Sequence, residues 1–466
     1  MSAFWTPKPT TNNHTVHQMS RKNLAPVWSN SLRCSMLLIL FVMSGCAPKS
    51  SSEVAEKQPS AEKTPPIKVT IVADTPADVE ALREAGYLLK NNQAGNVVEL
   101  AVASDESIAD SLSHLSGVPN VEIARFTGPG VSDEGMSVIE SWSKIKRLDF
   151  TDSAISNKTL DSIAKLPTLE ALFLRRTAAS KEGLAKLQSL SKLRAIDLRN
   201  TNVQDAALDE LAKIKSLVDI QLEKSKVTDD GVAKLADLKL KSFNANYCTS
   251  ISNVSLKILG AMKSLESIQL DYTKINDEGM KHLEGLSKLK RLRIRGSDVT
   301  GEGFKSIAGL KNLTRLELRD TSLDSDGLKI IASLPKVNFL DIAECRLVNS
   351  EGLAEIGKLT QLTYLGLWET KTDDEALNQF GGLTKLKELN LKSTDITDES
   401  IDTLLKFQDI ENINVAGTQL TDDSFRKLAA LPKLKLLNVA NTSIGYDVID
   451  ELVEKYAELK VVEFEN

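Results

Sequence analysis

One short pattern of apolar residues returns along most of this chain at a nearly constant interval, and it restricts the fold more than any other feature. Leu193-Arg-Ala-Ile196-Asp-Leu198 and Leu289-Lys-Arg-Leu292-Arg-Ile294 both have the form Leu-x-x-Leu-x-Leu. The same frame begins at Ile145, Leu169, Leu217, Leu240, Leu265, Leu313, Val337, Leu362, Leu386, Ile410 and Leu434, with weaker copies at Val97 and Val121. A last copy, Leu459-Lys-Val-Val462-Glu-Phe464, closes the array. The spacing is 24 residues nearly throughout, so the sequence predicts about 15 stacked repeats and a terminal strand.

Each repeat divides into a strand half and a helix half. In Leu-x-x-Leu-x-Leu the last two apolar positions alternate with polar ones, which indicates a half-buried strand. A turn such as Thr228-Asp229-Asp230-Gly231 follows, and a Thr N-cap with acidic neighbours suits the free amides at the start of a helix. Apolar residues three apart, such as Leu208, Leu211 and Ile214, then form one face of a short helix. One unit cannot bury both faces alone, but stacked units can.

The two halves also predict curvature. Parallel strands stack about 4.8 Å apart, whereas helix axes need about 8–10 Å. The array must therefore bend, with its strands inside and its helices outside. We predict an α/β solenoid (a horseshoe) of about 15 repeats of 24–25 residues, with a parallel β-sheet on the concave face and short helices on the convex face.

Two repeats contain cysteine and one extra residue. Cys248 and Cys345 stand where other repeats have Thr or Ser, and each of these repeats is 25 residues long. The two cysteines are four repeats apart, about 19 Å by strand spacing, which is too far for a disulfide. We interpret them as buried structural thiols and not as redox or metal ligands. The chain has only four cysteines and no CxxC pair.

The segment before the array has its own pattern. Ile67–Ile71 alternates like a strand, Ala77–Ala85 is expected to form a helix, and Tyr87–Leu100 is expected to fold back around Asn92–Asn96. The end of a solenoid core must be shielded from water. We therefore assign residues 67–96 as an N-terminal cap and residues 97–466 as the repeat domain.

The first 66 residues do not belong to the repeat domain. Met36–Met43 is an uncharged apolar run, too short for the roughly 20 residues of a membrane-spanning helix. Basic residues precede it and Ser44-Gly45 follow it, which is the arrangement of a secretory signal. Residues 47–66 are rich in Ser, Pro, Lys and Glu and are expected to form a flexible tether. A translation start at Met19 would give a signal peptide of more usual length. We therefore interpret residues 1–18 as preceding the true translation start.

The sequence Val42-Met43-Ser44-Gly45-Cys46 resembles the lipobox of bacterial lipoproteins. The resemblance implies that residues 1–45 are a signal peptide, that Cys46 becomes the acylated first residue, and that the tether spans residues 46–66. We accordingly expect an exported, membrane-anchored lipoprotein of the bacterial cell envelope, on its periplasmic or surface side.

The repeat frame, with its Thr-x-Val-Thr-Asp-x-Gly-Leu turn, resembles leucine-rich repeats of the ribonuclease-inhibitor-like class. The arrays of secreted or lipid-anchored proteins of planctomycete-type bacteria look most similar. This resemblance covers about residues 97–466. It implies protein–protein recognition on a broad open surface, without naming the partner. The cysteine repeats also look like those of F-box substrate receptors, although nothing before residue 97 resembles an F-box.

Composition and motifs disfavour several classes of function. Residues 1–46 contain four basic residues and no acidic one, so the rest of the chain carries −10 against −6 for the whole. A net negative chain is a poor general binder of nucleic acid. The chain lacks an HExxH motif, a phosphate-binding loop and a nucleophile elbow. We expect no enzyme activity, no cofactor and no metal. Paired carboxylates such as Asp197 and Asp219 are the weaker catalytic alternative.

Side chains between and beside the core leucines are expected to face the concave side. Among them, arginines and aromatic residues gather on neighbouring strands, which is the composition of a protein-interface hot spot. We assign as partner-binding residues Arg175, Arg199, Tyr247, Tyr272, Arg291, Arg293, Arg295, Arg315, Arg319, Phe339, Tyr364 and Trp368.

Three functional hypotheses remain open from the sequence. The first is a monomeric, lipid-anchored scaffold that binds a protein partner. The second is a binder of an envelope glycan or polyanion through the same arginines and aromatic rings. The third is a cytoplasmic substrate-recognition adaptor similar to F-box proteins, which requires that the export signal be spurious.

Overall fold

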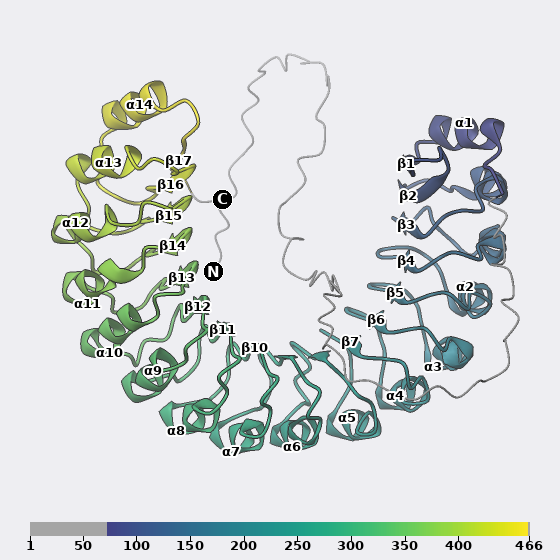
Figure 1. Ribbon diagram of the computed structural model, residues 1–466, viewed down its shortest axis with the longest axis horizontal. Helices are drawn as coiled ribbons and strands as arrows, with labels where there is room; N and C mark the ends of the chain where they lie inside the picture. Colours follow the sequence, from purple (N-terminus) through teal and green to yellow (C-terminus); the bar gives the residue numbers. More distant parts are fainter. Residues whose placement is uncertain (1–71, 465–466) are drawn as a thin grey trace, which may run out of the picture. The chain divides into compact units, whose positions relative to one another are not determined.

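The computed structural model describes residues 72–464. Within this part the strands form one 17-stranded sheet on the inner side of the array, and the helices lie on its outer side (Figure 1). The α/β repeat architecture predicted from the periodicity is confirmed. The predicted signal peptide, the predicted lipidation site at Cys46 and the predicted tether lie outside the described residues.

Sixteen strands run parallel, and each pairs with the next along the chain. The strand β1 (Leu88–Asn91) is antiparallel to β2 (Val97–Ala103). The others are β3 (Ile123–Thr127), β4 (Arg147–Asp149), β5 (Ala171–Phe173), β6 (Ala195–Asp197), β7 (Asp219–Gln221), β8 (Ser242–Asn244), β9 (Ser267–Gln269), β10 (Arg291–Arg293), β11 (Arg315–Glu317), β12 (Phe339–Asp341), β13 (Tyr364–Gly366), β14 (Glu388–Asn390), β15 (Asn412–Asn414), β16 (Leu436–Asn438) and β17 (Lys460–Val462). The sixteen parallel strands agree with the predicted repeats and terminal strand.

The helices on the outer side are short. They are α1 (Pro76–Glu84), α2 (Asn157–Ile163), α3 (Lys181–Lys186), α4 (Asp205–Leu211), α5 (Asp229–Lys234), α6 (Asn253–Ala261), α7 (Asp277–Met280), α8 (Gly301–Phe304), α9 (Ser325–Ala332), α10 (Ser350–Ala354), α11 (Asp374–Asn378), α12 (Ile401–Leu404), α13 (Asp422–Ala429) and α14 (Tyr446–Lys455). Turns of 3₁₀ helix complete the outer side: η2 (Ala109–Gly117), η3 (Met136–Ser141), η4 (Leu187–Ser189), η5 (Lys281–Leu283), η6 (Lys305–Ile307), η7 (Glu355–Lys358), η8 (Gln379–Gly382) and η9 (Asp398–Ser400). No helix in residues 72–464 has the length and apolar character needed to cross a bilayer.

The buried strand residues form one continuous column. Ile196 pairs in register with Ile220, and Ile268 pairs with Leu292. Phe243 of β8 lies between Ile220 and Ile268, and all five side chains are fully buried. The predicted stacking of the repeats is therefore confirmed at the level of single residues.

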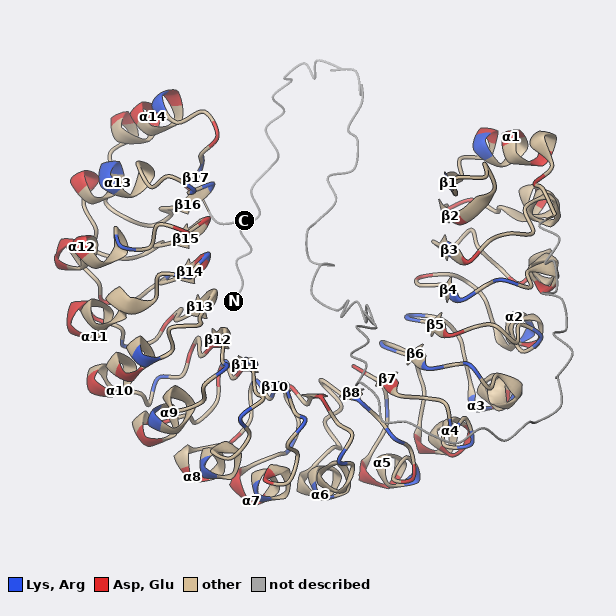
Figure 2. Ribbon diagram, viewed as in Figure 1, with Lys and Arg blue, Asp and Glu red and all other residues tan. Residues whose placement is uncertain are grey.

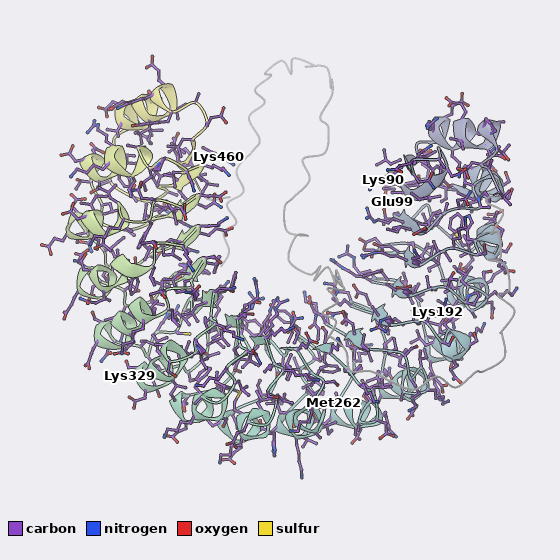
Figure 3. The ribbon with its side chains drawn as sticks, viewed as in Figure 1. Lys90, Glu99, Lys192, Met262, Lys329 and Lys460 are labelled. Atoms are coloured by element: carbon purple, nitrogen blue, oxygen red, sulfur yellow. The ribbon has the colours of Figure 1, made fainter. Side chains whose placement is uncertain are left out.

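The described part of the predicted N-terminal cap contains a helix and a hairpin. Helix α1 covers Pro76–Glu84, and the β1–β2 hairpin follows it. Lys90 lies beside Glu99 across the hairpin, with Nζ and Oε2 3.7 Å apart (Figure 3). The strand expected at Ile67–Ile71 lies outside the described residues.

The last strand is shifted by one residue from its predicted frame. The sequence frame aligned Val462 with the core leucines, but Leu437 of β16 pairs with Val461. Phe464 is consequently 71% exposed and does not enter the core. The reason is that no further repeat covers β17 within the described residues, so apolar burial does not select one register over the other.

Both repeat cysteines are buried. The thiol of Cys248 donates to the carbonyl oxygen of Leu222, and that of Cys345 donates to the carbonyl oxygen of Leu318, both at 3.2 Å. Burial raises the pKa of both thiols. The prediction of structural thiols is confirmed for their burial and free state.

Acidic residues at the starts of the helical segments link neighbouring repeats. Asp229 accepts hydrogen bonds from the backbone amide and the hydroxyl group of both Ser252 and Ser255 in the next repeat. The same link to the next N-cap is made by Asp133, Asp205, Asp277, Asp374 and Asp398. Figure 2 shows acidic residues in red on outer helices such as α7 and α11. The sequence predicted capping within one repeat, whereas these carboxylates also cap the next.

These links depend on charged carboxylates. Burial alone would raise the pKa of Asp229, but the hydrogen bonds from Ser252 and Ser255 outweigh it and lower the pKa below its ordinary value. The stabilisation by this residue is therefore complete above the ordinary aspartate pKa of about 3.9. It is lost as the pH falls through the lowered pKa of the folded state.

We predict that Asp229→Ala lowers the free energy of unfolding by about 1–3 kcal/mol, because it leaves part-buried donors of the next repeat without an acceptor. Asp230→Ala is the matched control, since the Asp230 side chain is exposed on the same helix turn, and its effect should stay within about 0.5 kcal/mol. Urea denaturation followed by circular dichroism measures both. Equal effects of the two substitutions would contradict the structural role of Asp229.

Candidate functional site

In-register pairing arranges the concave side chains in rows that cross the strands. One row contains the first residue of each strand, the second row contains the third residue, and a third row lies two residues further on. On β10 to β13 these rows bring eight of the predicted residues onto one continuous surface. We call this surface the central patch: Arg291, Arg293, Arg295, Arg315, Arg319, Phe339, Tyr364 and Trp368.

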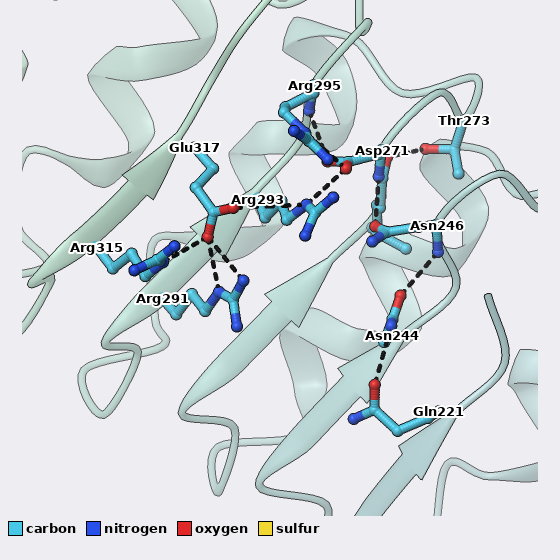
Figure 4. Close-up of polar contacts among 11 residues, drawn as sticks. Gln221, Asn244, Asn246, Asp271, Thr273, Arg291, Arg293, Arg295, Arg315 and Glu317 are labelled. Atoms are coloured by element: carbon cyan, nitrogen blue, oxygen red, sulfur yellow. Dashed lines mark hydrogen bonds and ion pairs between the residues drawn. The ribbon is translucent and has the colours of Figure 1, made fainter. Parts of the chain in front are cut away.

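The arginines of the central patch are joined by two carboxylates (Figure 4). Asp271 accepts from Nε of Arg293 at 2.5 Å and from Nε of Arg295 at 2.8 Å. Glu317 accepts from Nε of Arg291 at 2.9 Å and from Nε of Arg315 at 2.6 Å. Four guanidinium groups thus share two carboxylates, and the cluster keeps an excess of two positive charges. The sequence placed the arginines on this face but did not show that they are paired within the sheet.

Asp271 lies at the centre of this cluster and is fully buried. Its own backbone amide donates to Oδ1 of Asn246 at 2.8 Å, and its carboxylate also accepts from the backbone amide of Arg295. Burial raises the pKa of Asp271 to about 6, although Arg295 opposes the shift.

A column of stacked side chains adjoins the cluster. The guanidinium carbon of Arg315 lies 3.4 Å from the centre of the Phe339 ring. The Phe339 ring in turn stacks on Tyr364, with ring centres 3.9 Å apart and planes nearly parallel. The three residues occupy the same row on consecutive strands, so the strand spacing itself brings them into contact.

Trp368 is held by cations and not by another ring. The Arg319 guanidinium lies 4.3 Å from the ring centre, and Nζ of Lys392 lies 5.1 Å from it. Arg319 also pairs with Glu344 of the next repeat. Nε1 of Trp368 is buried and has no hydrogen-bond partner among the described residues.

Tyr247 and Tyr272 lie beside the central patch and not in its rows. They occupy the turns after β8 and β9, stack with ring centres 4.9 Å apart, and are 38% and 37% exposed. Both have a positive φ, as does the equivalent turn residue of most other repeats, for example Lys224 and Asp320. Gly296 holds the equivalent turn of the next repeat, where a Cβ atom would come within 2.3 Å of the Tyr272 ring. The absence of a side chain at this glycine makes room for the exposed tyrosine pair.

The remaining predicted residues lie further along the sheet. Arg199 makes a bidentate ion pair with Asp197, a buried residue of the same repeat. Nε of Arg175 is buried without a partner among the described residues. Asp219, the other carboxylate of the catalytic alternative, accepts from Gln221, and burial raises its pKa. In residues 72–464, no three His, Cys, Asp or Glu side chains are grouped to hold a metal ion.

We predict that the Asp271 carboxyl titrates near pH 6, well above the ordinary aspartate value of about 3.9. Because its pKa is raised in the folded state, its contribution favours folding below that range and weakens as the pH rises through 6. Carbon NMR of ¹³C-labelled aspartate measures the titration, and Asp271→Asn identifies the resonance. A midpoint below 4 would contradict this prediction.

Comparisons with known proteins bear on the fold. The family described as Leucine Rich repeat matches residues 382–405, about one repeat. No curated protein matches the chain. Among solved structures, an internalin of Listeria monocytogenes is 20% identical, with 84% of this chain and 95% of that chain covered and a TM-score of 0.41.

Two further solved structures are similar at the same level. A leucine-rich-repeat protein of Leptospira interrogans is 16% identical, covers 75% of this chain and 91% of its own, and has a TM-score of 0.49. The ectodomain of the Arabidopsis receptor kinase HAESA, in complex with a peptide hormone, is 13% identical, covers 83% and 77%, and also has a TM-score of 0.49. The repeat sequence, the in-register parallel sheet and the family match identify the chain as a leucine-rich-repeat protein.

Proposed function

We propose that this protein is a non-catalytic scaffold that binds a protein partner on its central patch. The observation that carries the proposal is the excess of two positive charges among the half-buried guanidinium groups of Arg291, Arg293, Arg295 and Arg315. Partly desolvated charge of one sign attracts a complementary group more strongly than charge in open water. Arginine next to aromatic side chains is also the usual composition of an interface hot spot.

The ring contacts favour a protein segment over a glycan. A sugar ring would need an open aromatic face, but Phe339 lies between Arg315 and Tyr364, so this column leaves open only the face of Tyr364 that is turned away from Phe339. The Trp368 ring is covered by the Arg319 guanidinium. An acidic protein segment needs only access to the guanidinium groups and to the ring edges.

To test the proposal, the purified protein would be used to capture proteins from envelope extracts, and the captured partner would then be titrated against variants. We expect Arg293→Ala and Trp368→Ala each to weaken binding by about tenfold or more, which corresponds to roughly 1.4 kcal/mol. Asn412→Ala is the matched control on the same face, outside the central patch, and should leave affinity unchanged. Thermal denaturation shows that each variant is folded. Equal affinity of the partner for all variants would contradict binding at the central patch.

We also propose that the protein acts at the bacterial cell envelope, anchored by a lipid on Cys46. The support is the basic segment, the short apolar run Met36–Met43 and the lipobox-like Val42–Cys46. The polar segment 47–66 that follows is long enough to separate the repeat domain from a membrane surface.

Mass spectrometry of the protein from its native membrane fraction tests the anchor. The expected N-terminal peptide begins at Cys46 and carries the mass of acyl chains. Recovery of an uncleaved peptide spanning Ser44–Ala47 would contradict both cleavage and lipidation, and it would favour the cytoplasmic adaptor instead. Cys46→Ala should abolish the acylated peptide and release the protein from the membrane.

A further inference from the structure

The stacked column of the central patch stops at Tyr364. Arg315, Phe339 and Tyr364 fill the first row on β11, β12 and β13, and the next residue in register is Glu388 of β14. Glu388 is exposed and makes no ion pair among the described residues. The column thus begins with a cation on an aromatic ring and ends with an aromatic ring beside a carboxylate.

A second carboxylate lies on the other side of the Tyr364 ring edge. Asp341 accepts one hydrogen bond, from the backbone amide of Ala343, and forms no ion pair within residues 72–464. Gly366 is its neighbour on β13, and a Cβ atom there would lie 2.7 Å from Oδ1 of Asp341 and 3.3 Å from Cε1 of Tyr364. The lack of a side chain at Gly366 leaves the Asp341 carboxylate beside the ring with no side chain between them. Asp341 is partly buried: burial raises its pKa, and Arg295 and Arg319 oppose that shift.

The charges around Tyr364 are mainly negative. Burial raises the pKa of its phenol, and Asp341 and Glu388 raise it further. Arg315 opposes them, but it lies beyond Phe339 in the column. A positive group placed on this ring would be stabilised by a cation–π interaction with the ring face and by Coulomb attraction to both carboxylates.

We propose that Tyr364, Asp341 and Glu388 form a subsite for a lysine or arginine side chain of the protein partner. This inference rests on the proposed function and deepens it. The guanidinium groups of Arg291 and Arg293 on β10 take an acidic group of the same partner. Three strand steps separate β10 from β13, about 14 Å. The partner therefore presents opposite charges about four residues apart if its segment is extended, at roughly 3.3 Å per residue.

The test uses a random dodecapeptide library displayed on phage and selected against the full chain. The expected binders carry an acidic residue and a Lys or Arg residue about four positions apart. Synthetic copies are then titrated by calorimetry. Glu388→Lys should weaken binding about tenfold, because the new ammonium group repels the basic residue of the peptide. Replacing that basic residue with Glu should restore affinity for Glu388→Lys.

Glu284→Lys is the matched control. It makes the same change of charge at an exposed residue on the helical side, and affinity should change less than about twofold. If Arg293→Glu abolishes binding while Glu388→Lys leaves it unchanged, the cation subsite is wrong and the central patch remains. If neither substitution affects the selected peptides, or if no peptide is enriched, both the subsite and the proposed function fail.

Discussion

The structure depends on the in-register stacking of one buried strand residue on the next. Ile196, Ile220, Phe243, Ile268 and Leu292 form a continuous column in which every side chain is fully buried. No single repeat encloses this column, because each supplies only one layer of it. The same spacing forces the wider helices to the outer side and leaves the strand face open (Figure 1).

Stacking also determines which polar side chains meet. Residues about 24 positions apart become neighbours, so Asp271 reaches Arg293 and Arg295, and Asp229 reaches the next N-cap. The open face is therefore a network of ion pairs before any partner arrives. The network leaves an excess of positive charge on β10 and β11, and it leaves carboxylates without ion pairs among the described residues beside Tyr364.

Periodicity was sufficient to predict the sheet, the helices, the buried cysteines and the position of the central patch. Periodicity was insufficient where two strand registers, or two side-chain pairings, would bury the same apolar residues. The last strand shifted because nothing covers Val461 and Val462 in the described residues, so either residue could align with Leu437. The pairing of Arg291 with Glu317 was also hidden, because a side chain in a row can turn toward either neighbouring strand. The repeat spacing predicts which residues lie next to each other on adjacent strands, but it does not predict the side-chain rotamer that decides which of them pair.

Departures from the repeat distinguish the central patch from the rest of the open face. On β14 to β16 the third residue of each strand is Asn, whose side chain accepts a hydrogen bond from the backbone amide two residues further on. By contrast, Gly296 makes room for a stacked pair of exposed tyrosines, and Gly366 leaves no side chain between Asp341 and Tyr364. Gly296 follows β10, which carries part of the arginine cluster, and Gly366 lies on β13, two strands beyond β11. A face that only needed to be solvated would require neither the exposed, stacked tyrosines nor the clustered arginines, and this combination is the composition of an interface hot spot.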